Sequence, residues 1–118
     1  MISKQLLSEV LGVKNLDSDI GLCIDKVNVI YGIIINDDDI DYYSINIYEF
    51  AHKCKEWAYV QGYIINSGRT TSNDWATTVY KVLEFNPYIK EVYHTWEIIE
   101  PEAIFKATEW VLRFKGII

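Results

Sequence analysis

Apolar residues recur at the spacing of one helical face in three segments of the chain. The first segment covers residues 4–11 and follows an N-cap at Ser3. The second follows an N-cap at Asn46, and the third has Pro101 at its first helical position. A glycine follows each segment and is placed to end the helix. The pattern therefore predicts three helices, each of which has to bury one face.

Other segments alternate apolar and polar residues, which predicts strands. Residues 27–35 alternate and are rich in β-branched side chains, so they form a strand. Residues 36–39 have the composition of a turn, and residues 40–45 return as the second strand of a hairpin. A short edge strand is also predicted around residues 22–24.

Beyond the second helix, residues 63–66 indicate a short strand and residues 67–74 a polar loop. Residues 75–85 and 89–99 alternate again and predict a second hairpin. The element order lacks regular alternation of strand and helix, and short connections favour antiparallel pairing. We therefore predict a single α+β domain over residues 1–118. Its mainly antiparallel sheet of four to five strands is packed with about three helices in two layers.

Composition and charge narrow the classes of function. The 118 residues include 17 acidic and 11 basic side chains, which gives a net charge of −6. Because the basic residues are scattered, no direct binding of nucleic acid is expected. Apolar runs are far shorter than a membrane span, and the N-terminus has no signal-peptide pattern. A cytoplasmic protein that does not bind membranes is therefore predicted.

The most distinctive candidate site is an acidic turn next to two tyrosines. Its residues are Asp37, Asp38, Asp39, Asp41, Tyr42 and Tyr43. Convergent carboxylates can hold Mg²⁺ or Ca²⁺, but the segment lacks the glycine and the glutamate of a calcium-binding loop. Side chains of a hairpin turn point into solvent, and acidic groups beside aromatic ones are typical of a protein contact. We interpret the turn as a partner-binding surface and expect no metal and no cofactor.

Two further residues are assigned to partner binding. Arg69 is the one basic residue in the polar loop, where a single glycine provides no phosphate-binding cradle. Trp75 lies at the edge of that loop and is the tryptophan expected to be exposed as an anchor. Trp57 and Trp110 lie on or beside helical stripes, so they are expected in the core.

The sequence offers little for catalysis. His52 and Cys54 are two residues apart on a helix, so their side chains point about 200° apart and share no site. Cys54 and His94 would form a nucleophile and base pair if the fold joined them. However, Cys54 lies on an apolar stripe, which favours a role in the core. Because the common nucleotide, metal and acyl-transfer motifs are absent from the sequence, a non-enzymatic protein is predicted.

The two longer predicted helices contain the sequences INIYEFAHKCKEWA (45–58) and EPEAIFKATEWVL (100–112). These segments resemble small uncharacterised proteins of bacterial phages and prophages. The resemblance implies an origin in a mobile element and a cytoplasmic location, and it assigns no activity to any residue. Many phage proteins of this size bind and block a host protein, including components of antiviral defence. The resemblance therefore favours an interaction protein.

Three hypotheses follow from the sequence. The first is an acidic module that binds and inhibits a host protein, such as a defence or nucleic-acid-handling component, through the acidic turn. The second is a small-ligand-binding domain or minor enzyme with a pocket between sheet and helices, where Arg69, His52 or His94 supplies a polar group. The third is a self-assembling subunit, a homo-oligomer that pairs through edge strands.

Overall fold

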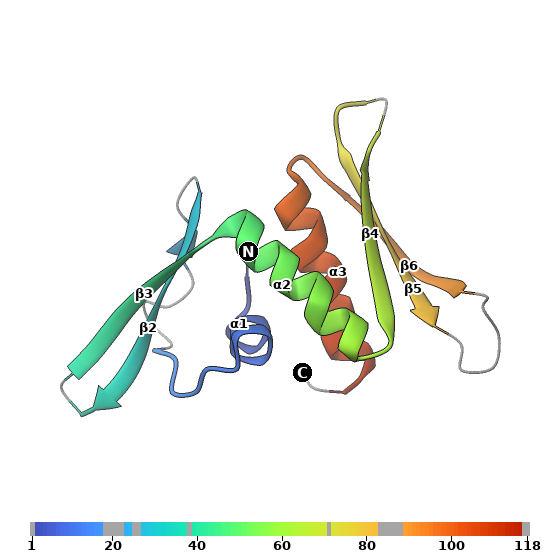
Figure 1. The fold of residues 1–118 in the computed structure, drawn as a ribbon. Coiled ribbons are helices and arrows are strands. Elements are labelled where there is room, and N and C mark those ends of the chain that lie inside the picture. Colours follow the sequence, from blue (N-terminus) through green and yellow to red (C-terminus); the bar gives the residue numbers. More distant parts are fainter. Residues whose placement is uncertain are drawn as a thin grey trace. The chain divides into compact units, whose positions relative to one another are not determined.

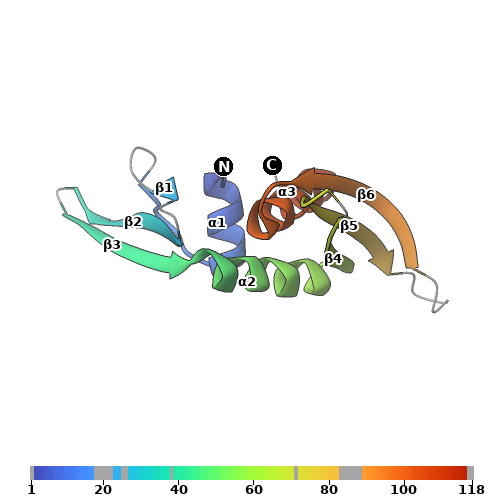
Figure 2. The same ribbon diagram turned by 90° about the horizontal axis from the view of Figure 1, so that it is seen from above.

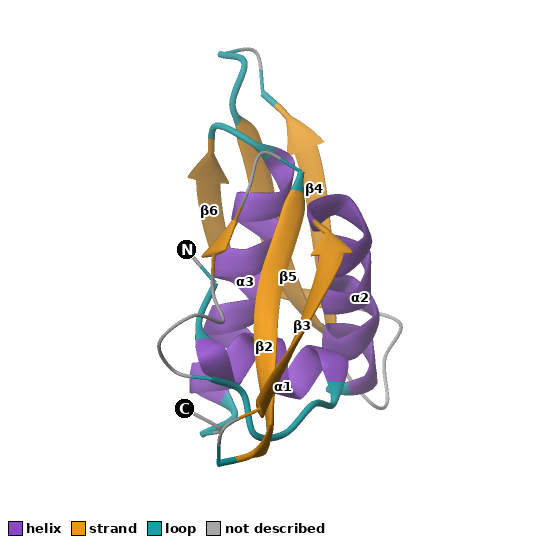
Figure 3. Cartoon of the chain, turned by 90° about the vertical axis from the view of Figure 1, so that its left-hand side faces the viewer, coloured by secondary structure: helices purple, strands orange, loops and turns teal. Residues whose placement is uncertain are grey.

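The computed structural model describes residues 2–17, 23–24, 27–37, 39–70, 72–82 and 89–116. Within these residues the chain forms three helices and six strands (Figure 1). In chain order they are α1 (Lys4–Leu11), β1 (Cys23–Ile24), β2 (Asn28–Asn36), β3 (Asp39–Asn46), α2 (Ile47–Val60), β4 (Tyr63–Arg69), β5 (Trp75–Val82), β6 (Ile89–Glu97) and α3 (Glu100–Phe114). The chain divides into two compact units, residues 1–53 and residues 54–118. The predicted α+β class is confirmed, and Figure 3 separates helices from strands by colour.

The described strands form two sheets, whereas a single sheet was predicted. One sheet has the order β1-β2-β3, and the other has the order β4-β5-β6. Every pairing is antiparallel, as predicted. Alternation identifies a strand and its two faces, but it does not say which strands are neighbours. Each strand here pairs with its neighbour in sequence, and α2 separates β3 from β4 in the chain.

The start and the end of helix α1 are set by local capping contacts. The Ser3 Oγ accepts the N–H of Leu6 at 3.1 Å, which caps the first turn. Gly12 adopts a φ of 67°, the left-handed conformation that ends a helix. Ile2 and Leu7 on either side of the cap are both buried, as expected for a hydrophobic staple. The predicted start and end of this helix are confirmed.

The β2–β3 hairpin is antiparallel, with Tyr31 opposite Tyr43. Strand β1 pairs with the other side of β2, where Leu16 also forms a bridge to Ile33. Strand β3 therefore has one neighbour among the described strands and is an edge strand. Residues 41–44 of β3 are all exposed, so both faces of this strand reach solvent.

Helix α2 begins at the predicted cap. The Asn46 Oδ1 accepts the N–H of Tyr48 at 2.9 Å and the N–H of Glu49 at 3.4 Å. Gly62 follows the helix with a φ of 92°, where a side chain would be strained. The predicted apolar stripe is buried, except that Trp57 is half-buried.

In the second unit, α3 packs on one face of the sheet and contacts β4, β5 and β6 (Figure 2). The predicted seam of α3 is buried and consists of Ile104, Phe105, Ala107, Thr108, Val111 and Leu112. The buried sheet residues are alternate positions of their strands, and they include Tyr63, Ile65, Thr77 and Val79. Helix and sheet therefore form two layers in this unit, in agreement with the prediction.

Strand β4 is longer than predicted. Residues 67–69 were assigned to a polar loop, but they pair with residues 75–77 of β5. Polar residues are compatible with a strand when one face of an antiparallel sheet is open to solvent. The connection is limited to residues 70–74, where the Thr70 N–H donates to the Asp74 carbonyl at 2.8 Å. Residues 83–85 of the predicted second hairpin lie outside the described residues.

A polar bridge connects three elements of the second unit. The Lys55 Nζ on α2 donates to the Ser67 Oγ on β4 at 3.1 Å. The same hydroxyl donates to the Glu100 Oε2 at the start of α3, at 3.0 Å. The hydroxyl thus uses both its donor and its acceptor capacity, and it joins a cation to a carboxylate.

Two glycines provide a matched test of the fold. A Cβ on Gly32 would lie 2.8 Å from the Cγ2 of Ile40, whose β-branched side chain is stiff. A Cβ on Gly68 would meet nothing within 4 Å. We expect Gly32→Ala to lower the free energy of unfolding by about 1–3 kcal/mol. Gly68→Ala should change it by less than about 0.5 kcal/mol. Urea denaturation followed by tryptophan fluorescence measures both, and equal losses would contradict this packing.

Candidate functional site: an acidic and tyrosine-rich hairpin

The β2–β3 hairpin carries most of the residues predicted to bind a partner. We define the hairpin surface as the exposed residues Asp37, Asp39, Asp41, Tyr42 and Tyr43. Asp38, which was also predicted, lies outside the described residues. Four of these five residues belong to the edge strand β3, so they lie beside an unoccupied strand edge in the described part of the sheet.

Short-range contacts order the side chains of the hairpin surface. The Asn36 Nδ2 donates to the Asp39 Oδ2 at 3.0 Å, and the Tyr43 hydroxyl donates to the Asp41 Oδ2 at 3.5 Å. The ring of Tyr31 stacks on Tyr43, with the ring centroids 5.7 Å apart. Partial burial raises the pKa of Tyr31, and the neighbouring Tyr43 adds to this increase. The Tyr31 ring is therefore neutral at physiological pH and presents an aromatic contact.

The pairing register assigns these residues to the two faces of the hairpin. Asp41 and Tyr43 lie on the same face as Tyr31, because strand residues alternate. Tyr42 lies on the other face, opposite Gly32. A Cβ on Gly32 would be 3.4 Å from the Tyr42 ring, so the missing side chain leaves room for this ring. Each face of the hairpin thus presents an exposed tyrosine.

The negative charge of the chain is concentrated around the hairpin. No lysine or arginine occurs from Val27 to His52, a stretch that contains five acidic residues. The first unit contains nine acidic and four basic residues, whereas the second contains eight and seven. An uneven distribution of this kind produces a local field that attracts a cationic surface.

Arg69 and Trp75 lie together in the second unit, as cross-strand partners of β4 and β5. Arg69 was predicted in the polar loop but is the last residue of β4, whereas Trp75 begins a strand, as predicted. Trp75 is half-buried, so the prediction that it is the exposed tryptophan is wrong. Trp75 shares the face of Thr77, which is buried in the sheet.

The exposed tryptophan of the described sheet residues is Trp96, with 59% of its surface accessible. Its ring makes an edge-to-face contact with His94 at a centroid distance of 4.4 Å. The His94 Nδ1 lies 2.8 Å from the Thr78 Oγ1. Both Trp75 and Trp96 occur in alternating segments, so assignment to a face requires the pairing register, which the sequence does not provide.

The possible pair of Cys54 and His94 is not formed. The Cys54 thiol is fully buried and bonds to Thr108, whereas His94 is exposed and bonds to Thr78. Burial raises the pKa of the Cys54 thiol, and the hydrogen bond with Thr108 offsets only part of that effect. A buried neutral thiol is a poor nucleophile. Among the described residues, no group of three or more His, Cys, Asp or Glu side chains is arranged to hold a metal ion.

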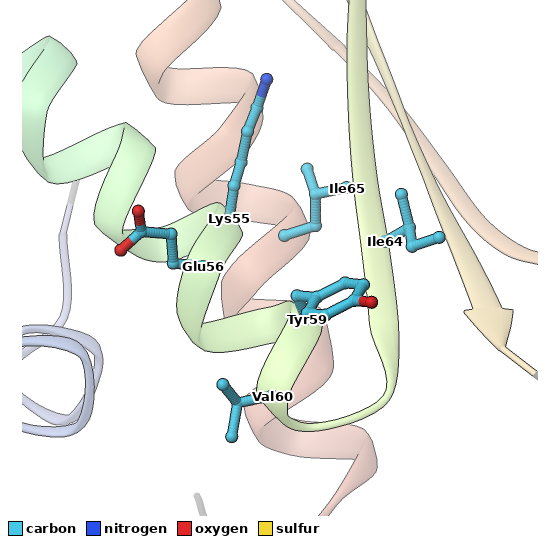
Figure 4. Close-up of a pocket in the computed structure, with 6 residues that line it drawn as sticks. All are labelled: Lys55, Glu56, Tyr59, Val60, Ile64 and Ile65. Carbon is cyan, nitrogen blue, oxygen red and sulfur yellow. The ribbon is translucent and has the colours of Figure 1, made fainter.

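The sequence did not indicate a groove in the second unit, which Figure 4 shows in close-up. The groove has a volume of about 400 Å³. It is lined by Lys55, Glu56, Tyr59 and Val60 of α2 and by Ile64 and Ile65 of β4. In the sequence, the signal for such a feature was the pair Tyr59 and Val60, which lies outside the predicted apolar stripe at the end of the helix. In the structure both side chains are exposed.

Comparison with known proteins gives no relative: no family model matches the chain, and no curated protein or solved structure is significantly similar to it. The resemblance to phage proteins therefore stays an expectation. Of the helices described, none has the length and apolar character needed to cross a membrane.

The environment of Cys54 predicts its reactivity. In a Cys23→Ser variant, Cys54 is the only thiol of the chain. We expect a thiol reagent at pH 8 to label this variant about 100-fold more slowly in buffer than in urea, because the thiol must first be exposed by unfolding. Labelling is measured by mass spectrometry. Rapid labelling of the folded protein would show that Cys54 is accessible and would contradict its burial.

Proposed function

We propose that the chain is a non-enzymatic interaction module that binds a basic surface of a partner protein through its hairpin surface. The observation that carries this proposal is a coincidence of three features at β3. They are a strand edge that pairs with no other described strand, exposed tyrosines and a stretch without lysine or arginine. Each feature alone is common on protein surfaces. Their coincidence on one hairpin favours a contact with a cationic partner.

The two kinds of side chain have different roles in such a contact. The carboxylates of Asp37, Asp39 and Asp41 attract a cationic surface over a distance and orient it. Tyr42 and Tyr43 supply contact area at short range, and they lose little conformational entropy when they are fixed. Arginine side chains of a partner would satisfy both groups, since they bind carboxylates and stack on aromatic rings.

The chemistry of the hairpin surface also suggests the class of partner. Proteins that handle nucleic acid present basic grooves to the phosphate backbone. An acidic module that occupies such a groove competes with nucleic acid and inhibits the partner. Together with the resemblance to phage proteins, this supports a host defence or nucleic-acid-handling protein as the partner, bound in the cytoplasm.

The two alternative functions rest on other observations. The groove between α2 and β4 favours a small-ligand site, but none of the polar residues expected in a ligand pocket, Arg69, His52 and His94, lines it. The edge of β3, which pairs with no other described strand, favours self-assembly, because strand edges can pair with one another.

The proposal is tested by neutralising the hairpin. The triple variant Asp37→Asn, Asp39→Asn and Asp41→Asn keeps the size and hydrogen-bonding capacity of these side chains and removes three charges. The tagged wild type should retain one dominant protein from host lysate at a defined stoichiometry. We expect the triple variant to bind that protein at least about tenfold more weakly, and we expect added salt to weaken the wild-type complex. Quantitative mass spectrometry and titration of the purified partner provide the measurements.

The matched control removes three charges elsewhere. In the variant Glu9→Gln, Glu56→Gln and Glu91→Gln, all three positions are exposed and lie outside the hairpin. This variant should bind the partner like the wild type. If both variants lose binding equally, total charge rather than the hairpin surface is responsible. If the wild type retains no partner and its mass increases with concentration, the chain self-assembles instead.

A further inference from the structure

The backbone of β4 has a defined hydrogen-bonding phase. In an antiparallel pair, every second residue exchanges both of its backbone hydrogen bonds with the partner strand. The residues between them point their N–H and C=O groups away from that strand. The Val82 N–H donates to the Gly62 carbonyl at 3.1 Å, and the Thr70 N–H donates to the Asp74 carbonyl at 2.8 Å. Both bonds belong to the same phase of the register. The even-numbered residues of β4 therefore bond to β5.

The odd-numbered residues of β4 point their N–H and C=O groups toward the free edge of the sheet. These residues are Tyr63, Ile65, Ser67 and Arg69. Strand β4 ends the sheet order, and within the described residues no backbone group bonds to this edge. Tyr63 and Ile65 are only 4% and 5% exposed. The edge is more open at its other end, where Ser67 is half-buried and Arg69 is exposed. Unpaired backbone groups along a strand edge form a template for another strand.

The groove adjoins this edge and provides apolar contact. Ile65 contributes to the groove and to the free edge, and Tyr59 and Val60 of α2 form the opposite wall (Figure 4). Tyr59 and Val60 are 68% and 80% exposed, although they are large apolar residues next to a groove. A ligand that covers them would remove this apolar surface from water.

Two cations are placed toward the other end of β4. Lys55 reaches the Ser67 hydroxyl, which also donates to the Glu100 carboxylate, and Arg69 is the exposed last residue of the strand. The groove wall also carries the carboxylate of Glu56, on the helix side. Ile65 and Arg69 are four residues apart, which corresponds to about 13 Å along a strand. The edge is therefore apolar near Ile65 and cationic near Arg69.

We infer that the β4 edge and its groove bind an extended segment of a partner protein, which adds to the β4-β5-β6 sheet as a further strand. A large apolar side chain of the segment fills the groove, and an acidic side chain about four residues away meets Arg69. The backbone of the segment pairs with Tyr63, Ile65, Ser67 and Arg69. Strand addition of this kind obtains affinity from backbone bonds and specificity from side-chain pockets.

The occupant is a lone strand rather than a second copy of this chain. The final turns of α2 line the groove beside the β4 edge. In a second copy, β4 would itself be flanked by an α2 helix that has to fit beside the first copy. An isolated extended segment carries no such helix. Its acidic character is argued from the exposed guanidinium of Arg69, because Lys55 is already joined to Glu100 through Ser67. This character is opposite to the basic character of the partner surface proposed for the hairpin.

A displayed library of random dodecapeptides, selected on the full chain, tests this inference. The enriched peptides should share a large apolar residue and an acidic residue about four positions away. A synthetic peptide of that sequence should bind Val60→Lys at least tenfold more weakly than the wild type. The control Ile98→Lys changes an equally exposed apolar residue of the same unit, 76% exposed, and should leave binding unchanged. Circular dichroism and urea denaturation establish that both variants are folded.

The backbone pairing is tested independently of the side chains. Bound peptide should slow amide exchange at Ile65, Ser67 and Arg69 at least tenfold. Exchange at Ile64 and Asn66, whose amides already bond to β5, should change little. N-methylation removes an N–H donor. It should abolish binding at the peptide residues whose N–H groups face β4 and be tolerated at the residues between them. These readouts do not involve the hairpin, so the hairpin triple variant should bind the peptide normally.

Several outcomes would overturn the inference. Selection that enriches no common motif would show that the edge binds no extended segment. Equal binding of the peptide to Val60→Lys and to the wild type would place the site elsewhere, as would equal losses in Val60→Lys and Ile98→Lys. Unchanged amide exchange at Ile65, Ser67 and Arg69 would exclude strand addition even if the groove binds the peptide.

Discussion

The arrangement of this chain depends on how it passes from one sheet to the next. Strand β3 is the edge of the first sheet, and β4 is the edge of the second, with α2 between them in sequence. A strand with one neighbour uses only half of its backbone groups in pairing. The direct passage from an edge strand into a helix, and from that helix into another edge strand, leaves on both strands a row of backbone groups that pairs with no other described strand. Both candidate binding surfaces lie on these two edges.

The two edges differ in their surroundings. In β3, the bond from the Ile47 N–H to the Val27 carbonyl shows that the odd-numbered residues bond to β2. The backbone N–H and C=O groups of the even-numbered residues therefore point toward the free edge. Side chains along most of that strand are exposed, and Asp39 and Asp41 make the edge anionic. Strand β4 instead begins with buried residues beside α2 and ends at Arg69. The same backbone geometry therefore supports contacts with partners of opposite charge.

The sequence predicted the features that depend on neighbouring residues. Helix α1 is capped by Ser3 and ends at Gly12, and α2 is capped by Asn46 and ends before Gly62. These ends are predictable because capping involves contacts within a few residues. Alternation likewise identified β2 and β3 and their turn. Exposure of Asp37, Asp39 and Asp41 followed from the same local chemistry, since turn side chains point into solvent.

Features that depend on distant pairing were not predicted. The division into two sheets and the face on which each tryptophan lies require knowledge of which strands are neighbours. Ser67, Gly68 and Arg69 have the composition of a loop, and only their pairing with β5 makes them a strand. The groove was missed for a related reason. It arises where the end of α2 adjoins an edge strand, and no motif encodes that adjacency.

The chemistry of each edge also limits self-association. Natural proteins protect edge strands with charges, with proline or by covering them. Strand β3 contains no proline and no lysine, so its protection comes from carboxylates. In the antiparallel register that places Asp39 of one copy opposite Asp41 of the other, like charges would face each other, and like charges in neighbouring strands destabilise a sheet. A cationic partner removes that repulsion, whereas a second copy doubles it. The negative charge of β3 thus opposes such pairing and is consistent with the basic partner that we propose. At β4, the flanking helix α2 is consistent with the proposed partner segment, which carries no helix of its own.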